Sequence, residues 1–144
     1  MTNDDWKRVN QDNTPFPGPR AFFVSGYDPP QVEVLRELLD GLGYTNAPIR
    51  CCAASQMDVS FERALSTESA DEPLGQGRLP YTMIISGMTA ADAGKIMQGF
   101  SASGLPRPIF ATSTETNLQF TVKELLRHLL AEQRAMVEAS QQAK

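Results

Sequence analysis

Two stretches of the chain decide its fold: AFFVSGYDPPQVEVLRELLDGLG, residues 21–43, and TMIISGMTAADAGKIMQGFSASG, residues 82–104. The motif VSGY at residues 24–27 returns as ISGM at residues 85–88, which is 61 positions later. In both stretches an apolar run is followed by a Ser-Gly turn, an amphipathic helical pattern and a glycine. Such self-similarity indicates an architecture built from two related units before it indicates any activity.

The short apolar runs are typical of strands that are buried on both faces. Between them, apolar residues recur at helical spacing and stop at glycines, where helices commonly end. The expected strands are residues 20–25, 49–53, 81–86 and 108–111. The expected helices are residues 30–42, 58–65, 89–103 and about 117–137.

Alternation of strands and helices predicts an α/β fold with right-handed crossovers. We expect internally duplicated βαβα units that form a four-stranded, mainly parallel sheet of order 2-1-3-4, with helices on both faces. In such a sheet the two Ser-Gly turns meet at the carboxyl ends of the central strands. The alternative is a ferredoxin-like α+β sandwich in which each copy supplies one βαβ unit.

The distribution of breakers along the chain predicts its domain organisation. Residues 1–19 are polar and end in a proline-rich run, which indicates a flexible N-terminal arm. Residues 20–140 then form a single domain, made of related halves at 20–65 and 80–138. A polar, breaker-rich stretch at residues 66–79 is expected to be a mobile loop between these halves.

Composition restricts the classes of partner. The chain has 144 residues, of which 41% are hydrophobic, and this suits one globular domain with a real core. Its net charge is −4, and Lys and Arg are not clustered with aromatic residues, which disfavours nucleic acid. The apolar runs are far too short to span a membrane, and the N-terminus does not resemble a signal peptide. We therefore expect a soluble cytoplasmic protein.

The residue types that usually carry catalysis or metal binding are scarce. Cys51 and Cys52 are adjacent, so they point to opposite faces of a strand and are better explained as buried small residues than as a redox pair. The one histidine, His128, lies in the last expected helix, and no Ser-His-acid or paired-carboxylate set can be assembled around it. We expect no catalytic residue, no metal site and no cofactor, and consider an enzyme improbable.

The turns after the strands are the best candidate for a ligand site, because open α/β sheets bind ligands where crossovers diverge. Pro29 and Pro30 remove backbone donors from the first helix, so an anion would bind at residues 87–91. The plainer interpretation is that the glycines permit tight turns and that Ser and Thr cap helices. The candidate ligand-binding residues are Ser25, Gly26, Tyr27, Ser86, Gly87, Met88, Thr112, Ser113 and Thr114.

The apolar stripe of the last helix continues to Met136 and Val137, past what one small sheet needs, and these two residues are candidates for partner binding. The sequence therefore favours a non-catalytic protein-binding or adaptor module, with an unknown protein partner or self-association. The alternative is a sensor that binds a small molecule or an anion at the Ser-Gly turns.

The segment PRPIFATSTETNLQFTVKELLRHLLAE, residues 106–132, resembles a bacterial family known only as a domain of unknown function. The shared features are a Pro-bearing strand, a Thr-rich turn, an Asn, an aromatic beside a Thr, and a Glu-Leu-Leu helix. Here these are Pro108, Thr112, Thr114, Asn117, Phe120, Thr121, Glu124, Leu125 and Leu126. The resemblance extends over about residues 80–134. Leu118 stands where the family tends to have Trp, and Ser113 and Glu115 lie in a turn that usually contains Pro. The resemblance implies a small soluble bacterial protein and no particular activity.

Overall fold

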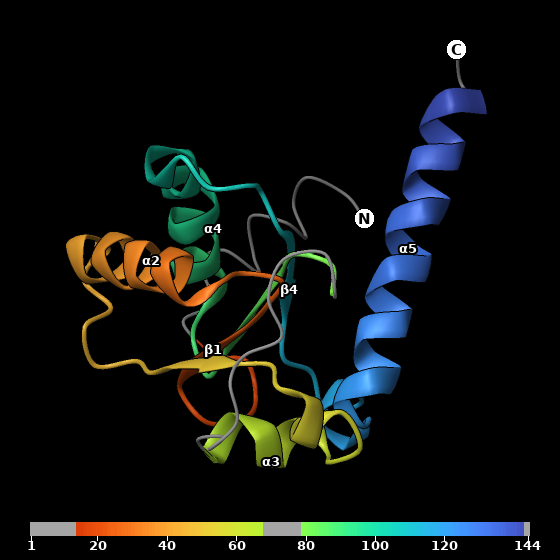
Figure 1. Ribbon diagram of the computed structural model, residues 1–144, viewed down its shortest axis with the longest axis horizontal. Helices are drawn as coiled ribbons and strands as arrows, with labels where there is room; N and C mark the ends of the chain where they lie inside the picture. The colour runs from red at the N-terminus through yellow and green to blue at the C-terminus, as the bar shows by residue number, and fades with distance from the viewer. Residues whose placement is uncertain (1–13, 68–78, 143–144) are drawn as a thin grey trace.

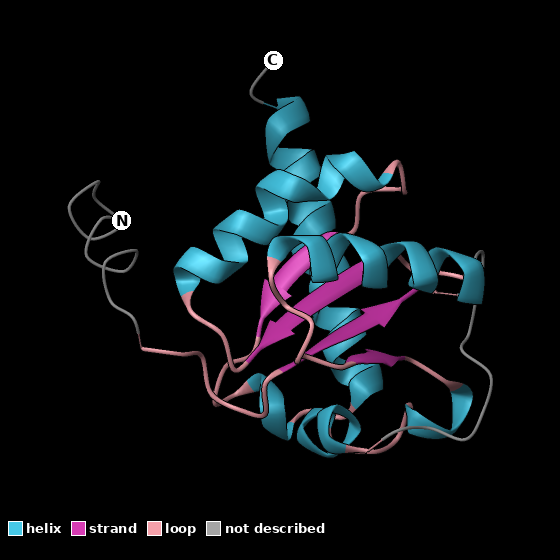
Figure 2. Cartoon of the chain, turned by 90° about the vertical axis from the view of Figure 1, so that its left-hand side faces the viewer, coloured by secondary structure: helices cyan, strands magenta, loops and turns pink. Residues whose placement is uncertain are grey.

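A four-stranded sheet lies between helices in the computed structural model, which describes residues 14–67 and 79–142 (Figure 2). The strand order across the sheet is β2-β1-β3-β4, as the sequence predicts. The strands are β1 (Ala21–Ser25), β2 (Ile49–Cys51), β3 (Thr82–Ser86) and β4 (Ile109–Thr112).

Helices cover both faces of the sheet (Figure 1). On one face lie α2 (Pro29–Leu42) and α4 (Ala90–Gly99). On the other lie α3 (Phe61–Ser66) and α5 (Val122–Gln142). The α/β class with helices on both faces is thus as expected.

The sheet is mixed, and the expectation of a mainly parallel sheet is wrong. β1 pairs with β2 in parallel, and β3 pairs with β4 in parallel, but the central β1–β3 ladder is antiparallel. The sequence could not reveal this, because a strand buried on both faces reads as the same apolar run in either direction. The ferredoxin-like alternative does not fit either, since there a strand of the other unit separates the two strands of each βαβ unit.

Alternate residues of the central strands supply two separate cores. Phe22 and Val24 of β1 point toward α2 and α4, where Leu39 and Ile96 are fully buried. Phe23 points to the opposite face and packs in the cluster of α3 and α5. Because side chains alternate along a strand, a continuous apolar run is what a sheet covered on both faces requires.

Thr89 caps α4, and the same cap ties α4 to the segment before β2. The Thr89 hydroxyl accepts from the Asp92 amide, and the Asp92 carboxylate accepts from the Thr89 amide at 3.1 Å. The same carboxylate accepts from the Tyr44 hydroxyl at 2.8 Å. Burial by itself would raise the pKa of Asp92, but the hydrogen bonds from Thr89 and Tyr44 and the nearby Arg20 charge outweigh it and lower that pKa.

The described end of the expected flexible arm lies against the carboxyl ends of β3 and β4. The Phe16 amide donates to the Met88 carbonyl at 2.8 Å, and the Ser113 hydroxyl donates to the Pro17 carbonyl. Residues 1–13 lie outside the described residues, as does nearly all of the loop expected at 66–79. Residues 14–20 therefore form a strap across this end of the sheet, and we use that name below.

The last helix begins later and ends later than the sequence predicts. Residues 117–119 form a short 3₁₀ turn, and α5 starts after Thr121, whose amide and hydroxyl both donate to the Glu124 carboxylate. Residues 131–140 are exposed along all sides, so α5 projects beyond the sheet (Figure 1). Every helix in the described part of the chain is too short or too polar to cross a membrane.

We expect Gly87→Ala to destabilise the fold far more than Gly104→Ala. Both glycines have positive φ (70° and 71°), so alanine is strained at either position by about 1 kcal/mol. A Cβ at position 87 would also lie 2.7 Å from the Arg20 backbone, whereas nothing lies within 4 Å of one at position 104. Urea unfolding should show a further loss of about 1–3 kcal/mol for Gly87→Ala. Equal losses would mean that the strap does not hold this turn.

We expect the contribution of the Asp92 carboxylate to stability to disappear in acid. Its folded-state pKa is lowered from 3.8, so the carboxylate stabilises the fold above that pH, and the contribution is lost as pH falls through the folded pKa. Asp92→Asn should therefore be less stable than the native chain near neutral pH, and the difference should shrink as pH falls below 3.8. Tyr44→Phe, which keeps the carboxylate, should show a smaller version of the same effect. A pH-independent difference in urea midpoints would contradict this assignment.

Candidate functional site

The two Ser-Gly turns lie at opposite ends of the sheet. In the central ladder Ala21 faces Ser86 and Ser25 faces Thr82, so the strands run past each other in opposite directions. Five-residue strands separate their ends by about 13 Å. The single pocket expected from both turns is therefore not formed, and its residues fall into two groups.

The first turn is occupied by contacts within the protein. The Ser25 hydroxyl lies 2.6 Å from the Thr82 hydroxyl and 2.7 Å from the Pro80 carbonyl. Gly26 passes so close to Pro80 that a Cβ would lie 2.8 Å from its carbonyl oxygen. The Tyr27 hydroxyl donates to the Pro106 carbonyl at 2.6 Å, and burial together with the neighbouring Tyr81 raises the Tyr27 pKa. These three residues join β1 to the segments before β3 and β4.

The second turn is covered by the strap. Ser86, Met88 and Ser113 are buried, and Gly87 packs against the backbone of Pro19 and Arg20. The Ser86 hydroxyl, which lies against Gly18, has no hydrogen-bond partner among the described residues. At the start of α4, the Asp92 carboxylate already accepts from the Thr89 amide. A bound anion at residues 87–91 would meet this negative charge, which weakens the case for an anion there.

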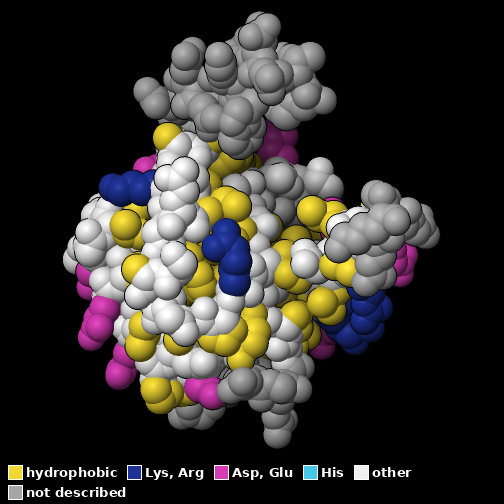
Figure 3. Space-filling model, turned by 90° about the horizontal axis from the view of Figure 1, so that it is seen from above, with side chains coloured by type: hydrophobic (Ala, Val, Ile, Leu, Met, Phe, Trp, Pro, Cys, Tyr) yellow, Lys and Arg dark blue, Asp and Glu magenta, His cyan; other side chains and the backbone are white. Residues whose placement is uncertain are grey.

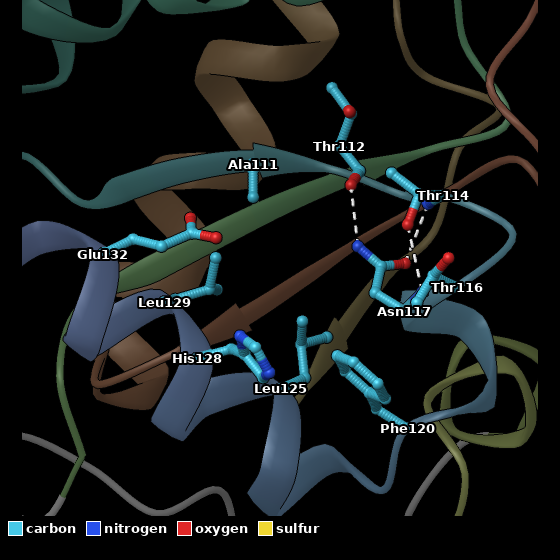
Figure 4. Close-up of a pocket in the computed structure, with 10 residues that line it drawn as sticks. All are labelled: Ala111, Thr112, Thr114, Thr116, Asn117, Phe120, Leu125, His128, Leu129 and Glu132. Carbon is cyan, nitrogen blue, oxygen red and sulfur yellow. Dashed lines mark hydrogen bonds between the residues drawn. The ribbon is translucent and has the colours of Figure 1, made fainter.

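Thr112 and Thr114 belong to a different cavity, of about 320 Å³, between the end of β4 and α5 (Figure 4). Its polar lining also includes Thr116, Asn117, His128 and Glu132, and its apolar lining includes Ala111, Phe120, Leu125 and Leu129. The expected trio of Thr112, Ser113 and Thr114 is thus divided, because Ser113 points inward and the two threonines border the cavity.

Asn117 organises the loop that forms this cavity. Its carboxamide oxygen accepts from the Thr114 amide at 2.8 Å, and the Thr114 hydroxyl accepts from the Asn117 amide at 3.0 Å. Its side-chain NH₂ group donates to the Thr112 carbonyl at 3.1 Å (Figure 4). The spacing Thr-x-x-Asn is a capping pattern that could have indicated the first two bonds, but the third depends on the fold.

His128 and Glu132 border the cavity from successive turns of α5. The His128 ring stacks on Phe120 with centroids 5.0 Å apart. Among the described residues, His128 forms no hydrogen bond to an acid or a hydroxyl, so no general base with an orienting partner is assembled here.

A second hollow adjoins this cavity and follows the outer edge of β4. This second hollow, of about 620 Å³, extends from Met97 on α4 across residues 107–111 to Met136 on α5. Ala111, Leu129 and Glu132 border both hollows. We call the two together the edge groove. Figure 3 looks onto the end of the molecule from which α5 projects, and hydrophobic side chains gather there.

The edge groove contains much of the exposed apolar surface of the described residues. Met97 is 39% exposed, Met136 is 68% exposed and Val137 is 45% exposed. Met136 and Met97 line the groove, and Val137 follows Met136 on α5. Of the two expected partner-binding residues, Met136 thus faces the groove, while Met97 was not anticipated because it occupies a core-like position of its helical pattern.

The two cysteines and the residue types that bind metals decide whether the described residues contain a redox or metal site. Burial raises the pKa of Cys51, and burial with the neighbouring Cys51 raises the pKa of Cys52 to about 12. Both thiols therefore stay protonated at neutral pH, which makes them poor nucleophiles. Across residues 14–67 and 79–142, His, Cys, Asp and Glu form no cluster that could hold a metal ion.

Comparison with known proteins finds a similarity to one family over part of the chain. Searches of the curated proteins and of the solved structures return no match. A family model described as "Domain of unknown function (DUF3783)" matches residues 82–136. This segment begins with β3 and ends at Met136, so it contains the lining of the edge groove. The resemblance expected from the sequence is thereby confirmed: residues 82–136 are similar to this uncharacterised family.

Proposed function

We propose that the protein is a non-catalytic protein-binding module whose binding surface is the edge groove. The observation that carries this proposal is an open sheet edge, β4, lying between two helices that present apolar side chains. Edge strands offer unpaired backbone groups, and extended chains commonly bind by adding a strand there.

The surroundings of β4 support a peptide chain as the ligand. Ile109, Phe110 and Ala111 are only partly buried, although each packs against one of the two cores. Long apolar side chains from α4 and α5 flank the strand on both faces of the sheet. Backbone pairing would supply affinity, and these side chains would recognise the side chains of the added strand.

The opposite edge of the sheet is less suited to this role. β2 has only three residues, and the side chain of its middle residue, Arg50, donates to the Leu65 carbonyl at 3.2 Å. Short edge strands discourage pairing with another chain. We therefore assign protein binding to β4 alone.

Site-specific photo-crosslinking in the producing cells tests this role. A photoreactive amino acid at position 136 should give protein crosslinks, and the same group at Glu37, an exposed position on α2, should not. Thr112→Pro should abolish the crosslinks because it removes an outward-facing N–H, whereas Thr112→Val, which keeps that N–H, should retain them. Crosslinks that are equal at both positions, or that ignore Thr112→Pro, would overturn the proposal.

A small-molecule sensor is the second candidate, and the cavity beside Thr112 and Thr114 favours it. Its volume of about 320 Å³ lies at the lower limit for ligand pockets, which is about 300 Å³. The Thr114 hydroxyl, the Asn117 carboxamide and the Glu132 carboxylate border it beside apolar walls, and binding sites commonly combine such groups.

Native mass spectrometry of gently purified protein tests the sensor role. A retained metabolite should appear as a mass above that of the chain, and Thr114→Val should reduce its occupancy while Thr45→Val, remote from the cavity, should not. A bound mass that is indifferent to Thr114→Val would place the ligand elsewhere. A chain free of any added mass would favour the protein-binding role.

We also propose that the two βαβ units are repeats of one ancestral unit. Phe23 and Ile84, which are equivalent in the 61-residue repeat, face each other at the centre of the β1–β3 ladder. If a two-fold axis through this pair relates the two units, equivalent residues must face each other in an antiparallel ladder, as Phe23 and Ile84 do. An experimental structure in which the units superpose best with another offset would contradict a common origin.

A further inference from the structure

The hydrogen-bonding groups of β4 alternate between the sheet and the edge groove. Ile109 donates to the Tyr81 carbonyl at 2.9 Å, and Ser113 donates to the Ile85 carbonyl at 3.0 Å. Residues at odd positions of β4 therefore face β3. Pro108, Phe110 and Thr112 turn their backbone groups outward.

Two of the outward groups are missing or already bonded. Pro108 has no N–H, so it offers only a carbonyl. Thr112 offers only its N–H, because its carbonyl accepts from the Asn117 side chain at 3.1 Å. Phe110 between them offers both groups. Along the outward edge, Pro108 therefore offers an acceptor, Phe110 offers a donor and an acceptor, and Thr112 offers a donor.

We propose that the edge groove binds β4 of a second copy of this chain, antiparallel and centred on Phe110. This proposal rests on the protein-binding role of the groove. Phe110 then exchanges two hydrogen bonds with its counterpart, and each Thr112 N–H donates to the Pro108 carbonyl of the other copy. The N–H that Pro108 lacks falls opposite the carbonyl that Asn117 already holds. The edge is complementary to itself, with four hydrogen bonds and no unmatched group.

Neighbouring registers match less well. A shift of two residues in one direction points the Phe110 N–H at the Thr112 carbonyl, which Asn117 holds. The opposite shift points the Thr112 N–H at the Pro106 carbonyl, which accepts from Tyr27 at 2.6 Å. Each alternative leaves only two bonds with free partners. The pattern of proline and occupied carbonyls thus selects the register centred on Phe110.

The same pairing explains the exposed apolar side chains. A two-fold axis perpendicular to the sheet keeps each face on its own side, so α5 approaches α5 of the other copy and α4 approaches the other α4. Met136 and Val137 on α5 and Met97 on α4 would then be covered. Residues 131–140 are exposed in the single chain, and the side of this segment that carries Met136 would become packed.

Sedimentation equilibrium of the full chain, from micromolar to millimolar concentrations, tests the dimer. The native mass should approach twice 15.8 kDa. Thr112→Pro removes two of the four hydrogen bonds and should raise the dissociation constant at least about tenfold, whereas Thr112→Val should change it by less than about threefold.

A second pair of variants tests the dimer independently, in case Thr112→Pro fails to fold. Met136→Glu adds a charge to the groove side of α5 and should raise the dissociation constant at least about tenfold. Ala131→Glu adds the same charge about 140° around the same helix and should leave it nearly unchanged.

Amide exchange identifies the interface. The N–H groups of Phe110 and Thr112 should become protected as the protein concentration rises, while those of β2 should not. A chain that remains monomeric at millimolar concentration, or a dimer that ignores Thr112→Pro and Met136→Glu, would overturn self-pairing. If position 136 still crosslinks to a different protein in a Thr112→Pro-sensitive manner, self-pairing fails and the protein-binding role stands.

Discussion

The antiparallel ladder between β1 and β3 is the interaction on which the other features depend. It joins two parallel strand pairs into one sheet. All five residues of β1 and all five residues of β3 are buried. Its direction sends the two Ser-Gly turns to opposite ends of the sheet. It also leaves β2 and β4 as the outer strands, and the edge groove follows the free edge of β4.

Much of this fold could be predicted from the sequence, because apolar runs and glycine stops mark the elements directly. Strand positions agree to within two residues, and the strand order is right. The direction of β3 could not be predicted, since Thr82–Ser86 is apolar enough to suit either direction. The start of α5 was missed because Asn117 bonds to Thr114 and forms a separate turn before the Thr121 cap. Its end was missed because residues after Val137 stay helical without a packed face.

The candidate site was predictable only in part, for related reasons. Thr112 and Thr114 were expected and border the cavity, but Ser25 and Ser86 were grouped with them on the assumption of a parallel sheet. The residues that carry the family resemblance have clear structural roles here: Asn117 holds the loop, and Thr121 with Glu124 caps α5. A sequence pattern reveals such local bonds, whereas an open strand edge becomes visible only once the strand order and direction are known.

Because the ribosome makes β1 long before β3, the central strand β1 is exposed on one edge during synthesis. Phe22 and Phe23 are fully buried on opposite faces of β1, yet β3 follows 61 positions later and the helix α5 later still. Closing a contact over that distance is slow compared with forming a local helix. During synthesis the segment AFFV can pack on α2 and pair with β2 early, but it stays without β3 while some sixty further residues emerge. For that interval one edge of this apolar strand is open, and nascent-chain chaperones can shield it, whereas crowded overexpression will tend to aggregate the chain there.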